Sequence, residues 1–271
     1  MPVVEIRDLR IAFAARGRTV QAVDGVDLTL EQGEVLGLLG ESGSGKSVTL
    51  RSILGLVPKR RAIVSGHVRT MGVDVLTARE RDLQALRGPK VAMVFQEPMT
   101  ALDPVYTIGR QIMEPIVAHE GVSWTEAGRR ARELLERVQI PSPERRLNAY
   151  PHELSGGLRQ RAMIAIALAC RPKVLLADEP TTALDATVQI QVLLLLRELQ
   201  KDLGMAVIMV THDVGVAAEV SDRIAVMHLG KVVEQGTAVD VLKRPQHAYT
   251  QSLLRATLRP DDEMETTVTQ A

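Results

Sequence analysis

The chain has 271 residues, which is long enough for one α/β domain with an inserted lobe or for two small domains. Its 33 Lys and Arg residues equal its 33 Asp and Glu residues, so no overall basic field attracts nucleic acid, and we predict no nucleic-acid partner. The sequence lacks a signal-peptide pattern and any apolar run of about eighteen residues, which predicts a cytosolic protein that reaches a membrane only through partners.

Strand-like runs open the chain. VEIRDLRIAF (residues 4–13) and VQAVDGVDLTL (20–30) alternate apolar and polar residues, as half-exposed antiparallel strands do. EVLGLLG (34–40) is almost wholly apolar, which indicates a buried strand. SGHVRTMGVDV (65–75) adds a short pair with a glycine turn. We therefore expect an antiparallel β region at the N-terminal end of the chain.

The stretch GESGSGKS (40–47) lies between that buried strand and a run with helical periodicity, and it fits the phosphate-loop pattern. Backbone N–H groups of residues 43–47 at a helix N-terminus would converge on phosphate oxygens. Lys46 would contact the β- and γ-phosphates, and Ser47 would be a ligand of Mg²⁺. The alternative is a plain Gly-Ser turn before a helix. We assign to ATP binding Gly40, Glu41, Ser42, Gly43, Ser44, Gly45, Lys46, Ser47 and Val48.

Farther along, KVAMVFQ (90–96) is a buried strand that ends on Gln96, and residues 97 to about 160 show helical periodicity with prolines between segments. Buried strands return at KVLLAD (173–178), MAVIMVTH (205–212) and RIAVMHLG (223–230), with helices at 157–170 and 186–203. This alternation predicts an α/β fold with a mainly parallel sheet and an inserted helical lobe. Cys170, the single cysteine, is interpreted as a core residue rather than a reactive thiol, and it alone cannot ligate a cluster.

Two adjacent carboxylates, Asp178 and Glu179, end the strand in LLADEP. Ligands collect at the carboxyl ends of parallel strands, so both acids would face the phosphate loop. Asp178 would belong to the Mg²⁺ shell, and Glu179 would polarise an attacking water. The alternative is a solvated turn.

A second helix start of this kind occurs at ELSGGLRQR, where Ser155 is a good N-cap and Gly156 and Gly157 expose backbone N–H groups. By itself such a capped helix is ordinary. Together with GESGSGKS, FQEPMTALDP, YPHELSGGLRQR, LLADEPTTALD, VTHD and PQHAYTQSLL, however, it resembles the ATP-binding subunits of ABC transporters, most of all the peptide and nickel importer group.

The resemblance implies a P-loop fold of the ABC ATPase type over residues 1–258. The polar, unpatterned sequence of residues 259–271 predicts a disordered tail. The resemblance also implies that Phe13 stacks on adenine, that Gln96 reaches Mg²⁺ and water, and that His212 contacts the γ-phosphate. The plain alternatives are that Phe13 is a core aromatic, that Gln96 caps the end of its strand and that His212 is a satisfied buried histidine. Ser155, Gly156 and Gly157 would contact ATP bound to a partner subunit. Asp185 would lie in a loop at the dimer interface and would cap the next helix in either case.

The function implied is ATP hydrolysis, catalysed by Glu179, His212, Gln96 and Lys46, that powers import of peptides or a related small solute. The expected partners are a second ATPase subunit, two permeases at the cytoplasmic face of the membrane, and a solute-binding protein that acts through them. Segment 97–111 is the expected permease contact. Leu158 replaces the usual glutamine, a change common in the importer group. Peptide importers of this group often continue into a cysteine-rich extension, whereas shorter members associated with nickel or metal-chelate uptake lack it. No cysteine follows the HAYT sequence here, so nickel or metal-chelate uptake stays an alternative. A soluble non-transport ABC ATPase and a P-loop kinase are the other classes considered.

Overall fold

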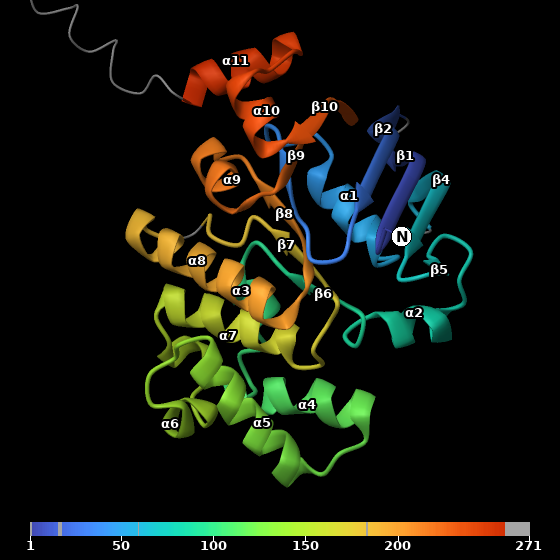
Figure 1. The fold of residues 1–271 in the computed structure, drawn as a ribbon. Coiled ribbons are helices and arrows are strands. Elements are labelled where there is room, and N and C mark those ends of the chain that lie inside the picture. The colour runs from blue at the N-terminus through green and yellow to red at the C-terminus, as the bar shows by residue number, and fades with distance from the viewer. Residues whose placement is uncertain (1, 16–17, 59, 183, 258–271) are drawn as a thin grey trace, which may run out of the picture.

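A computed structural model describes residues 2–15, 18–58, 60–182 and 184–257, which form two β-sheets with helices around them (Figure 1). The predicted tail, residues 259–271, lies outside the described residues. In the part of the chain that the structure describes, no helix is both long and apolar enough to cross a membrane.

The central sheet has the strand order β10-β9-β3-β8-β7-β6. Its first five members in the chain pair in parallel, and β10 pairs antiparallel with β9. The strands are β3 (Val35–Leu39), β6 (Val91–Val94), β7 (Val174–Asp178), β8 (Ala206–Thr211), β9 (Arg223–His228) and β10 (Lys231–Thr237). β3, β6, β7 and β8 are buried along their whole length, which explains their unbroken apolar sequences, because both faces of the sheet are covered.

The second sheet is antiparallel, in the order β2-β1-β4-β5. Its strands are β1 (Val4–Ala15), β2 (Arg18–Leu30), β4 (Ala62–Thr70) and β5 (Val73–Asp74). Helix α1 (Lys46–Ile53) lies between the two sheets, and its buried Leu50 and Ile53 join the cluster that includes Leu36 of β3 and Ile11 of β1. The N-terminal sheet therefore fixes where α1 begins, and with it the phosphate loop.

The inserted helical region lies at the end of the molecule opposite α11 (Figure 1). It contains α3 (Pro98–Ala101), α4 (Ile108–Glu120), α5 (Trp124–Arg137), α6 (Pro143–Leu147), a 3-10 turn (Pro151–Glu153) and α7 (Gly156–Leu168). Its apolar residues belong to one cluster with Leu175 and Ala177 of β7, whereas Val174 and Leu176 of the same strand face the α1 side. Helix α7 therefore belongs to a hydrophobic core that is continuous from the central sheet to the helical region.

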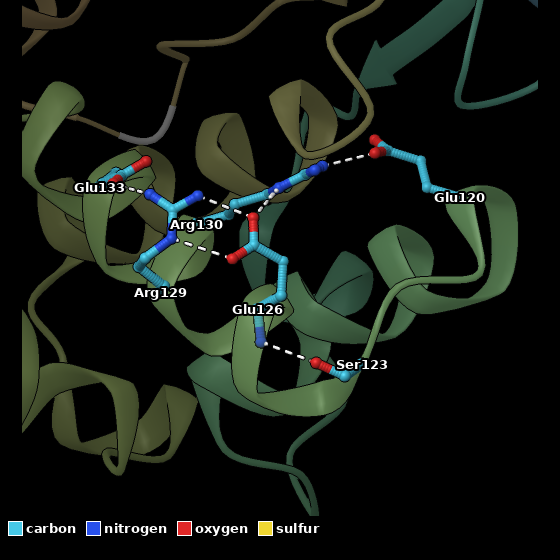
Figure 2. A network of polar contacts seen from close by, with 6 residues as sticks. All are labelled: Glu120, Ser123, Glu126, Arg129, Arg130 and Glu133. Atoms are coloured by element: carbon cyan, nitrogen blue, oxygen red, sulfur yellow. Dashed lines mark hydrogen bonds and ion pairs between the residues drawn. The ribbon is translucent and has the colours of Figure 1, made fainter.

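Polar contacts tie α5 to the end of α4 (Figure 2). The Glu126 carboxylate accepts hydrogen bonds from Arg129 and Arg130, which also pair with Glu133 and Glu120 respectively. Ser123 caps α5 by accepting from the backbone N–H of Glu126 at 3.2 Å.

The remaining helices pack around these sheets. They are α2 (Glu80–Leu86), α8 (Ala186–Leu203), α9 (Val214–Val220), α10 (Ala238–Lys243) and α11 (Ala248–Thr257). Of these, α9 contacts β3 and β8, α10 and α11 contact β10, and Leu83 of α2 lies beside Gly55, after α1. The predicted α/β fold, with a mainly parallel sheet, an antiparallel N-terminal β region and an inserted helical region, is confirmed. The expected helix at 157–170 ends earlier, at Leu168, and sequence analysis assigned no element to residues 231–257, where β10, α10 and α11 lie.

Candidate nucleotide-binding site

The phosphate loop joins the end of β3 to the start of α1, and two of its positions admit only glycine. Gly40 has φ 151°, and an added Cβ would lie 2.2 Å from the Met227 carbonyl oxygen. Gly45 has φ 103°, and an added Cβ would lie 2.4 Å from the Ala22 carbonyl oxygen. Gly45 is also the N-cap of α1 and supplies no side chain, so the first N–H groups of the helix stay open to an anion.

Lys46 is the charged group of this loop. Its ammonium donates hydrogen bonds to the carbonyl oxygens of Gly40 at 2.7 Å and Glu41 at 2.8 Å, and the residue is 4% exposed. Burial lowers the pKa of Lys46, whereas the Glu179, Asp178 and Glu41 carboxylates raise it. A phosphate would add a further negative charge beside the ammonium and favour its charged form.

A buried hydroxyl in the same loop has no protein partner. Ser44 is 4% exposed, and its Oγ makes no hydrogen bond with the described residues. A buried hydroxyl without a partner is unfavourable, so the loop contains a polar group whose hydrogen-bonding capacity is unused in the chain alone.

Asp178 ends β7 directly opposite the first turn of α1. Its Oδ1 accepts a hydrogen bond from Ser47 Oγ at 2.8 Å. Asp178 is 3% exposed; burial raises the pKa of its carboxyl, and the hydrogen bond from Ser47 opposes that shift. The predicted pair of Ser47 and Asp178 is therefore brought together by the fold.

Glu179 follows immediately, and three polar side chains converge on one of its oxygens. Glu179 Oε2 accepts from Gln96 Nε2 at 3.0 Å and from Thr182 Oγ1 at 3.0 Å, and it lies 3.3 Å from His212 Nδ1. The backbone of Glu179 is left-handed, with φ 47°, which is strained for a residue other than glycine. The His212 side chain is 57% exposed, so the interpretation of His212 as a buried histidine is wrong.

An open cavity of about 520 Å³ is lined both by residues of the phosphate loop and by Gln96, Glu179 and His212. Its lining residues are Ala22, Glu41, Ser42, Gly43, Gly45, Lys46, Ser47, Val48, Gln96, Glu179 and His212. Sequence analysis missed Ala22 and also Thr182. Ala22 reaches the loop only through the packing of β2, and no local pattern marks it. Phe13 is half-buried and packs against the core between the two sheets, and it is not among the lining residues; its stacking on adenine stays a prediction.

The second glycine-containing helix start lies elsewhere. Ser155 caps α7 by accepting from the N–H of Leu158 at 3.4 Å, and Asp185 caps α8 by accepting from the N–H of Val188 at 2.9 Å. An added Cβ on Gly157 would lie 2.7 Å from Val188 Cγ1, so the two helix starts adjoin. Neither Ser155 nor Asp185 lines the cavity around Lys46.

Cys170 follows α7 in a turn and is 9% exposed. Its Sγ donates to the carbonyl oxygen of Pro115 at 3.5 Å, and burial raises the pKa of the thiol to about 11. The thiol is therefore neutral at physiological pH, which is the state of a core cysteine rather than a nucleophile.

Comparison with known proteins identifies this arrangement. The family model described as ABC transporter matches residues 23–182. The probable peptide ABC transporter ATP-binding protein y4tR of Sinorhizobium fredii is 50% identical over 93% of this chain and 76% of its own length. The oligopeptide transport ATP-binding protein OppD of Bacillus subtilis is 48% identical over 97% of this chain and 75% of its own length.

Among solved structures, the dimeric ATP-binding cassette MJ0796 in a post-hydrolysis state with ADP and phosphate superposes with a TM-score of 0.78. It is 31% identical, and the match covers 87% of this chain and 98% of that one. With the family match over residues 23–182 and the geometry of the phosphate loop, these similarities show that the chain belongs to the ABC transporter family and is an ATPase.

Proposed function

We propose that this ATPase powers the import of peptides, or of a related small solute, across the cytoplasmic membrane. The observation that carries the proposal is that Gln96, Glu179 and His212 line one cavity with the phosphate loop, in a chain whose relatives are named as peptide transport ATP-binding proteins. Nickel or metal-chelate uptake is the alternative transport role.

We assign the activation of water to Glu179. A water between its carboxylate and the terminal phosphate would transfer a proton to Glu179 as the water oxygen attacks phosphorus and ADP leaves. Lys46, which lines the same cavity, would offset the charge that develops on the phosphate oxygens. His212 Nδ1 already lies 3.3 Å from Glu179, so its ring is near enough to orient both the base and the phosphate.

The residues beside the loop fit Mg²⁺. Ser47 Oγ and Asp178 Oδ1 are 2.8 Å apart, and Gln96 offers an amide oxygen at the same cavity. Hydroxyl, carboxylate and amide oxygens are the ligands that Mg²⁺ prefers, and the bound ion would offset negative charge on the phosphates. Burial raises the pKa of Asp178, whereas a cation beside the carboxylate would lower that pKa and so favour the ionised form.

ATP is proposed to lie between two subunits. A helix N-terminus stabilises an anion only within its first turn, and Ser155 does not line the cavity of its own chain. An economical arrangement is that Ser155, Gly156 and Gly157 contact ATP held by the loop of a second ATPase subunit, with Asp185 at the same interface. The partner is either a second copy or a different subunit.

The permease contact is assigned to residues 97–111. Met99 is 56% exposed, Val105 70% and Tyr106 49%, which is unusual for large apolar side chains so close together. Beside them a cavity of about 450 Å³ is lined by Phe95, Gln96, Glu97, Thr100, Ala101, Arg51 and Asp178. An apolar permease segment in this region would place the ATPase peripherally at the cytoplasmic face, with a solute-binding protein acting through the permeases.

The test is reconstitution of the chain with two permeases and a second ATPase subunit from the same organism, in proteoliposomes supplied with ATP. We expect internal accumulation of a labelled peptide, stimulation of phosphate release by peptide-loaded binding protein, and loss of both with Glu179→Gln. Accumulation of nickel or a metal chelate instead would transfer the proposal to the alternative solute. Failure of the chain to associate with any permease, at an unchanged ATPase rate, would favour a non-transport ABC ATPase.

A further inference from the structure

One peptide unit at the start of the phosphate loop is fixed from both sides. The unit between Gly40 and Glu41 contains the Gly40 carbonyl and the Glu41 N–H. The carbonyl oxygen accepts from Lys46 Nζ at 2.7 Å, and the N–H donates to the hydroxyl of Tyr249 at 3.3 Å. In a trans peptide these two groups point in opposite directions, so the two contacts together set the rotation of a single plane.

This peptide needs an external contact because its first residue is glycine. Gly40 lacks a Cβ and has φ 151°, so its own sterics do not fix the orientation of the unit that follows. The β9–β10 turn fixes the next part of the loop, where Gly230 N–H donates to the Ser44 carbonyl at 3.0 Å. Water can solvate the N–H of the exposed Glu41, but it cannot impose a direction on the peptide plane.

Tyr249 is itself well positioned for this contact. Its ring lies 3.8 Å from the ring of His228, at the end of β9, with a tilt of 31°. The start of α11 is fixed to β10, because the Glu234 carboxylate accepts from the N–H groups of Gln246 at 2.8 Å and His247 at 3.0 Å. Burial raises the pKa of Tyr249, so its hydroxyl keeps its proton and accepts through a lone pair.

We propose that Tyr249 is a positioning residue for phosphate binding. Its hydroxyl orients the Gly40–Glu41 peptide so that the carbonyl of Gly40 receives the Lys46 ammonium, and the ammonium is thereby directed at the phosphate cavity. Helix α11, 208 residues from Glu41, thus forms part of the nucleotide site. The proposal uses the loop's binding of ATP and is independent of the transported solute.

The test compares Tyr249→Phe, which keeps the ring and removes the hydroxyl, with Tyr150→Phe on the full chain. Tyr150 stacks on His152 and does not line the loop cavity. A fluorescent ATP analogue is titrated against each protein. We expect Tyr249→Phe to raise its Kd roughly fivefold, the fold-change equivalent to about 1 kcal/mol, and Tyr150→Phe to leave it unchanged. In steady-state hydrolysis, KM for ATP should rise more than kcat falls.

Two further measurements separate orientation of the loop from general packing. Amide hydrogen exchange of peptides covering residues 40–46 in the nucleotide-free protein should accelerate in Tyr249→Phe, while exchange in α8 stays unchanged. Tyr249→Ala should weaken nucleotide binding at least as much as Tyr249→Phe. If Tyr249→Phe binds and exchanges like the wild type and only Tyr249→Ala is impaired, the ring alone matters and the proposal is wrong. Binding by the wild type and its loss in Lys46→Ala show, independently, that the titration reports on this loop.

Discussion

At the scale of single residues, Lys46 carries the charge that would face ATP. Its ammonium is fixed by the two carbonyls of Gly40 and Glu41 at the wall of the cavity. We predict that Lys46→Ala raises the Kd for ATP roughly 10- to 100-fold, since a hydrogen bond to a charged group contributes about 1.5–3 kcal/mol. Titration with a fluorescent analogue measures this, with Lys243→Ala on the exposed face of α10 as the control. An unchanged Kd in folded Lys46→Ala would remove this lysine from the site.

Removing the charge of Asp178 should stabilise the nucleotide-free fold but weaken Mg²⁺-dependent ATP binding. Burial raises the pKa of its carboxyl, so the nucleotide-free fold is penalised at neutral pH for a buried negative charge. We expect Asp178→Asn to raise the midpoint of thermal unfolding at pH 7 and to weaken Mg²⁺-dependent ATP binding. The carboxyl becomes neutral below its raised pKa, so the gain in midpoint should shrink as the pH falls through that value.

The control for that experiment is Asp202→Asn, a change at an exposed position near the end of α8. Its midpoint should stay near that of the wild type at every pH. A lower midpoint for Asp178→Asn at pH 7 would mean that the carboxylate stabilises the fold and that its burial is not the dominant effect.

At the scale of elements, the α5 network of Figure 2 predicts how the helical region responds to acid. Hydrogen bonds from Arg129 and Arg130 lower the pKa of Glu126 to about 2. A lowered folded-state pKa gives stability above the ordinary value of 4.5, and this stability is lost as the pH falls toward 2. We expect Glu126→Gln to unfold at lower urea concentration than the wild type at pH 7, with a small difference because the network is exposed.

That difference should decrease as the pH falls below 4.5 and as salt is added, because added ions screen exposed charges. Glu198→Gln, at an exposed position of α8, serves as the control and should show neither trend. Urea unfolding at several pH values measures both variants. A Glu126→Gln difference that is constant with pH would assign the effect to helix propensity rather than to charge.

Some elements could be predicted from the sequence and others could not. Strands β3, β6, β7 and β8 were predictable because burial on both faces leaves an unbroken apolar run. β10, α10 and α11 were not assigned; β10 and α10 are only seven and six residues long and partly exposed. The loop residues and Glu179 followed from local motifs. Ala22 and Tyr249 reach the loop only through tertiary packing. Tyr249 lies in the motif PQHAYTQSLL, but the motif does not show that its hydroxyl contacts the backbone of Glu41.

At the scale of the whole molecule, the separation of Ser155 from the loop cavity predicts an ATP-dependent dimer. Glu179→Gln should bind ATP, hydrolyse it slowly and accumulate as a dimer, since binding energy is retained while the base is removed. Adding Ser155→Arg should prevent the dimer, because the larger side chain would meet the partner's phosphate, and should leave ATP binding to the monomer nearly intact. Light scattering after size exclusion, with and without ATP, measures the mass.

The chain offers a matched control in Ser123→Arg. Ser123 caps α5 as Ser155 caps α7, by accepting from a backbone N–H in the first turn, so both changes remove an N-cap. Only Ser155→Arg should abolish the dimer in the Glu179→Gln background. If Ser155→Arg instead abolished ATP binding by the isolated monomer, the α7 start would act within one chain and the two-subunit site would be wrong.

The contacts around the Glu179 carboxylate affect how fast the chain would hydrolyse ATP when it is not bound to a transporter. Its Oε2 accepts from Gln96 and Thr182 and faces His212, so little capacity remains on that oxygen to take a proton from water. Proton transfer through Oε2 requires at least one of these donors to leave. Gln96 immediately precedes the segment assigned to the permease, so a permease movement that displaces Gln96 would free the base. We therefore expect the isolated subunit to hydrolyse ATP slowly, and the hydrolysis rate of the assembled transporter to rise when the transported solute is present.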